Sequence, residues 1–265
     1  MEASDLGVYN PLDFILQKCT SQLMLTTYVI NLAGSDQRWD ATSSRLKELG
    51  VPFERFEAVD GRVNPHPLFS RYDDKLREKY RRKALSGGEL GCFASHFLLW
   101  EKCLELNKPI VVLEDDLIIN PSLNEALTIA EQQIDSLRYL RLAGTYPKPK
   151  TYKKIQSLGQ FDLVDHIRGP AGTLAYVISP SAASALINHA EKWFIAVDDF
   201  MDHYWWHGVD CYSLMPFPVE VAENDSDIVR VVKAKQPLWK KLRKEVYGLV
   251  ERMRLIIYRV QNQRL

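Results

Sequence analysis

One segment constrains the fold more than any other part of this sequence: four apolar residues, 110 to 113, run directly into three carboxylates, Glu114-Asp115-Asp116. The run Ile-Val-Val-Leu is typical of a strand buried on both faces, as in a mainly parallel sheet. Open α/β sheets bind their ligands outside the carboxyl ends of such strands. We therefore predict an α/β fold with a ligand site at these carboxylates.

The order of the three carboxylates indicates a cation site. Successive side chains of an extended chain point to opposite sides, so Glu114 and Asp116 should share one side and Asp115 the other. Two carboxylates on one side suit Mg²⁺ or Mn²⁺, which proteins hold through one or two carboxylates at diphosphate sites. Such a cation neutralises a leaving diphosphate. The alternative is that these acids only end the strand and begin a turn.

The sequence around this strand predicts further units of an α/β fold. Residues 28–32 and 53–59 have strand patterns, and the helical pattern from Ser35 to Leu49 lies between them. Strand, helix and strand in this order begin a parallel sheet. The proline-containing segment 64–67 and the charged stretch from Arg71 to Lys83 predict an insertion or a mobile loop. Further strands are predicted at 139–143 and 173–178, with helices opening at Ser86 and at Ser179-Pro180.

A glycine-rich segment, Ser86-Gly87-Gly88-Glu89-Leu90-Gly91, opens the second predicted helix, which should end near Asn107 before Pro109. Glycines at a helix start would let a phosphate or ribose approach the exposed backbone N–H groups. The alternative is a tight loop that packs against the helix. His96 lies further along this helix, and a single histidine there is more often structural than catalytic.

A third cluster combines acids with aromatic residues between Val197 and Trp206. In a helix, Asp198 and Asp199 would each share a face with Asp202. Carboxylates beside aromatic rings are common in sugar sites, because sugar hydroxyls need acceptors and their C–H faces pack on rings. One of these acids could act as a general base. The alternative is a solvated helix start followed by core aromatics.

Charge is balanced over the whole chain but not along it. Lys+Arg and Asp+Glu both total 34, which gives no basic excess for a nucleic-acid partner. Residues 235–265 nevertheless contain nine basic and two acidic residues, a net charge of +7. Apolar residues recur among them at helical spacing, which predicts a basic amphipathic helix for an anionic membrane surface; packing on the domain or on a second subunit is the alternative. These apolar residues are Leu238, Trp239, Leu242, Val246, Leu249, Val250, Met253 and Ile257.

Several motifs in fixed order resemble glycosyltransferase family 25, which includes bacterial lipooligosaccharide glycosyltransferases and collagen galactosyltransferase domains. The resemblance covers about residues 27 to 228. It implies a GT-A type, Rossmann-like single domain, a UDP-hexose donor (galactose or glucose), inversion at the anomeric carbon and a lipid-linked oligosaccharide acceptor. The motifs that carry it are Tyr28-Val29-Ile30-Asn31-Leu32, Phe56-Glu57-Ala58-Val59-Asp60-Gly61, Gly88-Glu89-Leu90-Gly91-Cys92 with Ser95-His96, Val112-Leu113-Glu114-Asp115-Asp116, Gly172 to Pro180, Val197-Asp198-Asp199-Phe200 and Ser226-Asp227-Ile228.

The same resemblance assigns roles to individual positions. Glu114 and Asp116 take the place of the Asp-X-Asp type metal motif; because Glu replaces the first Asp, it stays open whether Asp115 or Asp116 is the main ligand of Mn²⁺ or Mg²⁺. Inversion needs a base across the sugar from the metal, and we expect Asp198 or Asp199 there, with Asp202 as a further candidate. Asn31, Arg38, Asp60 and Gly61 are expected near the uridine, and Gly88, Glu89, Gly91, Ser95 and His96 near the ribose and diphosphate.

These observations predict an N-terminal extension (1–24), one transferase domain (25–234) and a C-terminal helix (235–265). Four cysteines without paired short spacing indicate free thiols, and no stretch of 18 apolar residues occurs, so we expect a cytoplasmic protein, peripheral on the inner face of the inner membrane. Two other functions are considered: a catalytically inactive sugar or nucleotide-sugar binding module on the same fold, and a nucleotidyltransferase or other diphosphate enzyme. The sequence does not identify the hexose, the acceptor, the linkage or the oligomeric state.

Overall fold

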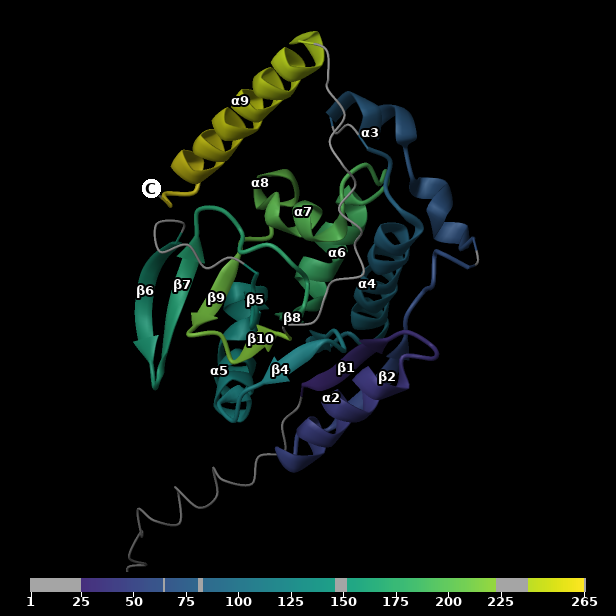
Figure 1. Cartoon of the computed structure of the whole chain (residues 1–265). Coiled ribbons are helices and arrows are strands. Elements are labelled where there is room, and N and C mark those ends of the chain that lie inside the picture. The colour runs from purple at the N-terminus through teal and green to yellow at the C-terminus, as the bar shows by residue number, and fades with distance from the viewer. Residues whose placement is uncertain (1–24, 64, 81–82, 146–151, 223–237, 265) are drawn as a thin grey trace, which may run out of the picture.

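The computed structural model describes residues 25–63, 65–80, 83–145, 152–222 and 238–264, and the structural statements below concern these residues. A central sheet of eight strands has the order β2-β1-β3-β8-β5-β9-β7-β6 (Figure 1). The strands are β1 Thr26–Asn31, β2 Phe53–Glu57, β3 Ile110–Leu113, β5 Tyr139–Arg141, β6 Tyr152–Leu158, β7 Phe161–His166, β8 Ala175–Ile178 and β9 Tyr212–Met215; β4 Leu117–Ile119 and β10 Val219–Val221 form a separate antiparallel pair.

The direction of the strands confirms the predicted α/β class. Strand β1 is parallel to β2 and to β3, and β5 is parallel to β9. Strand β8 lies antiparallel between β3 and β5, so β3 and β5 point the same way. The hairpin β6–β7 adds to the edge through an antiparallel pairing of β7 with β9. Six of the eight strands therefore run in one direction, and β7 and β8 run against them.

Helices cover both faces of the sheet, and alternate residues of the central strands supply two separate cores. On one face Ile110 and Val112 pack with α4 and α6; on the other Val111 and Leu113 pack with α2 and α5. This alternation explains why the run 110–113 is apolar at every position. The helices are α2 Asp36–Glu48, α3 Asp74–Tyr80, α4 Gly87–Leu106, α5 Leu123–Leu137, α6 Pro180–His189, α7 Val197–Asp202, α8 Tyr204–His207 and α9 Leu238–Gln261, with a 3₁₀ turn, η1, at Pro67–Arg71.

Local capping signals place the helices where the sequence predicts them. Ser86 and Glu89 form a capping box at the start of α4, which ends at Asn107 in a left-handed conformation. Ser179 caps α6, with Pro180 at its first position. Helix α2 is followed by Gly50 at a φ of 67°, a conformation that glycine adopts at little cost.

The prediction of a mobile loop is wrong for residues 67–80, whereas the alternative, an insertion, stays a prediction. Residues 67–71 form η1, and Asp74–Tyr80 form α3. Arg77 is buried and donates to the carbonyl oxygens of Lys83 and Phe194, at 2.7 and 3.1 Å. The contact between Arg77 and Phe194 joins residues that are far apart in sequence, so no local sequence pattern predicts it.

The predicted C-terminal helix forms as α9 and packs against the domain through one side. Trp205 Nε1 and Trp206 Nε1 both donate to Glu251 Oε2, each at 2.8 Å. Tyr258 donates to Asp210 at 2.9 Å, and Arg259 pairs with Asp165 at 3.2 Å. None of the helices described is long and apolar enough to cross a membrane.

Candidate active site

The site is built at the carboxyl end of β3, where Glu114 donates its backbone N–H to Leu174 O at 2.8 Å. Its side chain accepts from Thr173 Oγ1 at 2.5 Å and faces α4. Asp115 takes different neighbours: its carboxylate accepts from Asn31 Nδ2 at 2.5 Å and lies 4.0 Å from Arg38. The alternation along the chain therefore sends these two acids to different surroundings, as predicted.

Glu114 belongs to a buried polar chain with two side chains of the core. His96 Nε2 lies 3.4 Å from Glu114 Oε1, and His96 Nδ1 lies 2.9 Å from Tyr176 Oη, which also accepts from Trp100 Nε1 at 3.1 Å. The contact between His96 Nε2 and Glu114 falls short of hydrogen-bond geometry, so His96 Nε2 has no hydrogen-bond partner among the described residues. Burial alone would raise the pKa of Glu114, but the His96 imidazole and the Thr173 hydroxyl outweigh it and lower that pKa. Glu114 is thus held as a carboxylate.

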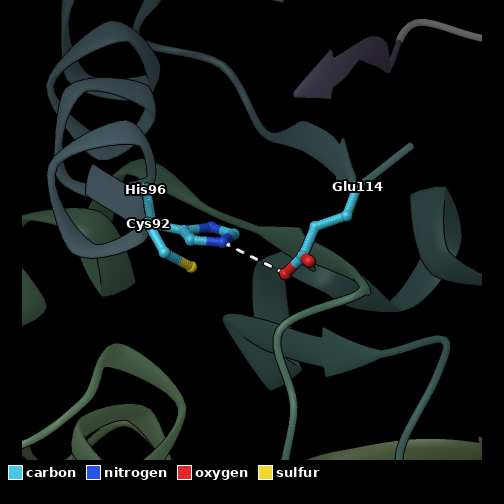
Figure 2. Close-up of side chains that lie close together, drawn as sticks. All are labelled: Cys92, His96 and Glu114. Atoms are coloured by element: carbon cyan, nitrogen blue, oxygen red, sulfur yellow. Dashed lines mark ion pairs between the residues drawn. The ribbon is translucent and has the colours of Figure 1, made fainter. Parts of the chain in front are cut away.

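Cys92, His96 and Glu114 each offer a ligand atom to one point, with all three atoms within 4.8 Å of one another (Figure 2). Cys92 and His96 come from successive turns of α4, and Glu114 from the end of β3. Thiolate and imidazole ligands suit Zn²⁺ better than Mg²⁺ or Mn²⁺. Burial raises the pKa of the Cys92 thiol well above its usual value, and the charges of Glu114 and Asp198 add to this shift. Without a soft cation, Cys92 is therefore a neutral thiol.

Asp116 has a buried carboxylate oxygen, Oδ1, that finds no hydrogen-bond donor among the described residues. Burial, followed by the charges of Glu114 and Asp115, raises the pKa of Asp116 to about 6. An acceptor in this state is costly to keep ionised unless a cation or a donor pairs with it. Asp116 therefore has the electrostatic character expected of a cation ligand.

Asn31 is fully engaged by protein groups. Its Nδ2 donates to Asp115 and, at 3.1 Å, to Ser35 O, and its Oδ1 accepts from Arg55. Burial raises the pKa of Asp115, and the Asn31 amide and the Arg38 charge oppose that shift. In the structure Asn31 fixes Asp115 at the site, while its predicted contact with the uridine stays a prediction.

The predicted glycine-rich segment contains two close backbone contacts. A Cβ at Gly61 would collide with the carbonyl oxygen of Gly87, and one at Gly91 with that of Val59. Ser95 supports the same contact, since its hydroxyl accepts from Val59 N–H and donates to Gly91 O, both at 2.9 Å. Packing of α4 on the segment after β2 therefore explains these small residues.

The other predicted binding residues in this region have local partners or open space. Gly88 has nothing near its Cα that a side chain would meet. The Glu89 carboxylate accepts from Ser86 within the capping box. Asp60 pairs with Arg62 at 3.0 Å, and this hydrogen bond lowers the pKa of Asp60. The role of these three residues in binding stays a prediction.

Arg141 is a central residue of the site that the sequence patterns do not predict. Its side chain is fully buried at the end of β5, and Nη2 lies 2.6 Å from Asp202 Oδ1. Nη1 donates to the carbonyl oxygen of Gly172, and Asp202 Oδ2 accepts from Ala171 N–H at 2.9 Å. The sequence does contain one signal for this ion pair: an arginine lies within the apolar run 139–143, and a buried charge needs a partner.

Helix α7 carries the three predicted acids, as expected from their spacing. Asp202 is paired with Arg141 and is packed against Gly169, where a Cβ would collide with its carboxyl group. Asp198 accepts from Asp199 N–H at 2.7 Å. Desolvation raises the pKa of Asp198, and the charge of Asp199 raises it further, against the Arg141 charge. Asp198 thus has a raised pKa, and its carboxylate takes no part in the ion pair between Arg141 and Asp202.

Comparison with known proteins shows which proteins this chain resembles. A mosquito protein, "Glycosyltransferase 25 family member" of Aedes aegypti, is 36% identical over 106 residues, which are 36% of this chain and 16% of that protein. "Lipooligosaccharide biosynthesis protein lic2B" of Haemophilus influenzae is 28% identical over 63% of this chain and 64% of its own length. "Probable inactive glycosyltransferase 25 family member 3" of Bos taurus is 24% identical over 71% of this chain and 35% of its own length.

The chain spans less than two thirds of the length of these relatives. The family itself is matched more broadly, since residues 24–201 fit Glycosyltransferase family 25 (LPS biosynthesis protein). The matched range contains β1, the glycine-rich start of α4, the three carboxylates after β3, and Asp198 and Asp199 of α7. This chain belongs to glycosyltransferase family 25.

Proposed function

We propose that this chain is an inverting hexosyltransferase of the GT-A type, which moves galactose or glucose from a UDP-sugar to a lipooligosaccharide core. The observation that carries the proposal is that two groups of acids belong to the site: the carboxylates after β3 and those of α7. The pKa of Glu114 in the first group is lowered, and that of Asp198 in the second is raised. Their coupling supports one site, because the charge of Asp198 raises the pKa of Cys92 beside Glu114. Family membership and the name of the Haemophilus influenzae relative support the reaction class and the acceptor.

A divalent cation, Mn²⁺ or Mg²⁺, fits Glu114 and Asp116 better than the Cys92-His96-Glu114 cluster. Asp116 Oδ1 is a buried acceptor without a described donor, and Glu114 makes its described contacts through Oε1 alone, so Oε2 is available. Asp115 is less suited, since Asn31 already donates to it. Oxygen ligands are those that these hard cations prefer. When bound, the cation would neutralise the diphosphate leaving group.

Asp198 is proposed as the general base that takes the proton of the acceptor hydroxyl. A base with a pKa raised toward the working pH transfers protons more efficiently, and the neighbouring Asp199 contributes to that rise. Asp202 is better suited to positioning, because Arg141 and Ala171 N–H occupy both of its oxygens. Arg141 thereby links the end of β5 to the helix that carries the base.

Helix α9 is proposed to rest on an anionic membrane surface, on the cytoplasmic side of the inner membrane where a lipid-linked acceptor would lie. Its domain side contains the buried Glu251, Leu255 and Arg259. The opposite side exposes one continuous apolar stripe: Val246, Leu249, Val250, Met253, Ile256, Ile257 and Val260. Arg259 and Arg264 pair with Asp165 and so contribute less to a basic surface than the sequence implies.

A catalytically inactive binding module is the second candidate function, because one relative carries the description "probable inactive". Release of UDP from a panel of UDP-sugars, with and without Mn²⁺ and with oligosaccharide acceptor, separates the two. The proposed function predicts metal-stimulated UDP release with one UDP-hexose. Binding of a UDP-sugar without any release in the presence of acceptor would favour the inactive module. Diphosphate release from a nucleoside triphosphate would instead indicate a nucleotidyltransferase.

A further inference from the structure

A cleft lies between α9 and the helices α7 and α8, and it borders the candidate active site at Asp202. One part has a volume of about 540 Å³ and is lined by Trp205, Trp206 and Tyr258 among others. A second part of about 290 Å³ continues from it and is lined by Asp202 and His203. Figure 1 shows α9 beside α7 and α8. The lining residues of the cleft come from α9 on one side and from the domain on the other.

Aromatic rings line the walls of the cleft, and the N–H groups of its two indoles are already bonded. Trp205 and Trp206 both donate their indole N–H to Glu251, so their ring surfaces are what they can offer to a ligand. The His203 ring lies 4.6 and 4.4 Å from these two indoles, and Tyr80 lies 4.6 Å from Tyr247. Half-buried rings of this kind suit the C–H faces of a pyranose.

Two arginines and two carboxylates line the smaller part of the cleft, and the carboxylates, Asp202 and Glu251, already pair with Arg141 and Arg254. Arg168 comes from the segment after β7 and Arg252 from α9, and both line the smaller part. Neither guanidinium forms an ion pair with another described residue, whereas Arg254 nearby is paired with Glu251 at 2.9 Å. Guanidinium groups bind phosphate and carboxylate through charge-assisted, bidentate hydrogen bonds. The cleft therefore favours a ligand with an anionic substituent.

The cleft reaches the proposed catalytic acids through Asp202. Asp202 lines the smaller part and lies one helical turn from Asp198 on α7. A sugar chain in the cleft would thus have its end close to the proposed base. The donor site at the end of β3 and the aromatic cleft would then meet at α7. A transfer between two sugars requires such an arrangement.

We propose that this cleft is the acceptor site, and that it takes a sugar chain carrying an anionic substituent, phosphate or carboxylate, between Arg168 and Arg252. The proposal rests on the transferase function proposed above and names the class of its acceptor. Trp205 and Trp206 hold the sugar ring, and the two arginines select the charged substituent.

Binding is tested without catalysis by following the ¹⁵N indole signals of the full chain during titration with glucose 6-phosphate, glucuronate, glucose and inorganic phosphate. The signals of Trp205 and Trp206 should shift with one or both charged sugars, and those of Trp39 and Trp193 should not. Which charged sugar binds more tightly identifies the substituent. Arg168→Gln with Arg252→Gln should weaken this binding at least about tenfold, the loss expected when a charged hydrogen bond is removed. The matched control is Lys47→Gln, an exposed charge on α2, which should bind as the wild type does.

Three results would overturn the proposal: indole signals that respond to none of the probes, an equal response to glucose and to its phosphate, and the same response to inorganic phosphate alone. A kinetic measurement distinguishes failure of this proposal from failure of the transferase function. The double arginine variant should hydrolyse the UDP-sugar in water at the wild-type rate, while its transfer to a charged acceptor falls at least about tenfold. If the wild type releases UDP from no UDP-sugar with acceptor supplied, the transferase function fails, whereas the titration still decides the cleft.

Discussion

Arg141 and Asp202 form an ion pair inside the protein: Arg141 Nη2 lies 2.6 Å from Asp202 Oδ1, and the Arg141 side chain is fully buried. The pair joins strand β5 to helix α7, and Asp202 also accepts from Ala171 N–H on the segment before β8. The geometry of the acids on α7 therefore depends on a residue far away in sequence.

Replacing both partners should cost less than the sum of the two single replacements. Arg141→Met leaves Asp202 as a buried charge without its partner and should lower the free energy of unfolding by about 3–5 kcal/mol. Arg141→Met with Asp202→Asn should lose less than the sum of the two single variants. Urea unfolding of the four proteins measures this difference. Strict additivity would show that the pair does not couple β5 to α7.

Variants of three neighbouring residues distinguish the proposed metal ligands from the other side chains near them. Asp116→Asn should weaken Mn²⁺ binding at least about tenfold, because a charged oxygen ligand is lost. Cys92→Ser should leave Mn²⁺ binding unchanged, since burial keeps the thiol protonated. Asp115→Asn is the matched control, because Asn31 already engages that carboxylate. Calorimetric titration with Mn²⁺ measures all three affinities. An equal loss of affinity in Cys92→Ser and Asp116→Asn would indicate that the metal binds at the cluster of Cys92, His96 and Glu114 instead.

The general base should reveal itself in the turnover number and in its pH dependence. Asp198→Asn should lower kcat by about 10²- to 10⁴-fold, the usual contribution of a general base. The charge of Asp199 raises the pKa of Asp198, so Asp199→Asn should lower that pKa and move the acidic limb of kcat to lower pH. UDP release at saturating acceptor, measured across pH, tests both effects. Full activity in Asp198→Asn would exclude it as the base.

Local patterns were sufficient for much of the fold but not for the contacts that complete the site. The apolar run 110–113 predicts β3, and the Ser86 capping box predicts the start of α4, because both depend on neighbours in sequence. Arg141 was missed, since its partner Asp202 is 61 residues away. The glycines at 87 and 91 illustrate the same limit, because a ligand loop and a close helix contact use the same residue type. The positions of Gly61 and Val59, which lie against these glycines, distinguish the two cases.

A buried histidine should make stability depend on pH. His207 donates from Nε2 to Phe200 O at 3.2 Å and accepts from Val209 N–H at 3.2 Å. Burial lowers its pKa from 6.5 to about 3. Between these two values the unfolded chain binds a proton that the folded protein does not, so the stabilisation from His207 is present above pH 6.5 and is lost as pH falls toward 3.

His207→Gln removes this titration and should reduce the pH dependence accordingly. The advantage of the wild type over the variant should shrink on acidification by at most about 1.4 kcal/mol per pH unit. Urea unfolding of both proteins at neutral and mildly acidic pH measures the difference, and other titrating groups cancel in the comparison. A constant difference between the two proteins would mean that His207 is not buried as a neutral side chain.

The outward stripe of α9 should decide membrane binding, and point substitutions test it better than truncation. Removing α9 would also remove Glu251 and Arg259, which are buried against the domain. Leu249 and Met253 are 58% and 54% exposed on the opposite side, and replacing both with Glu should reduce binding to phosphatidylglycerol-containing vesicles at least about tenfold, through lost apolar burial and added repulsion. The matched control is Val63→Glu, at an apolar position that is 71% exposed on the domain. Co-sedimentation with vesicles measures the effect, and equal binding by the stripe variant and the wild type would mean that this side of α9 faces another partner.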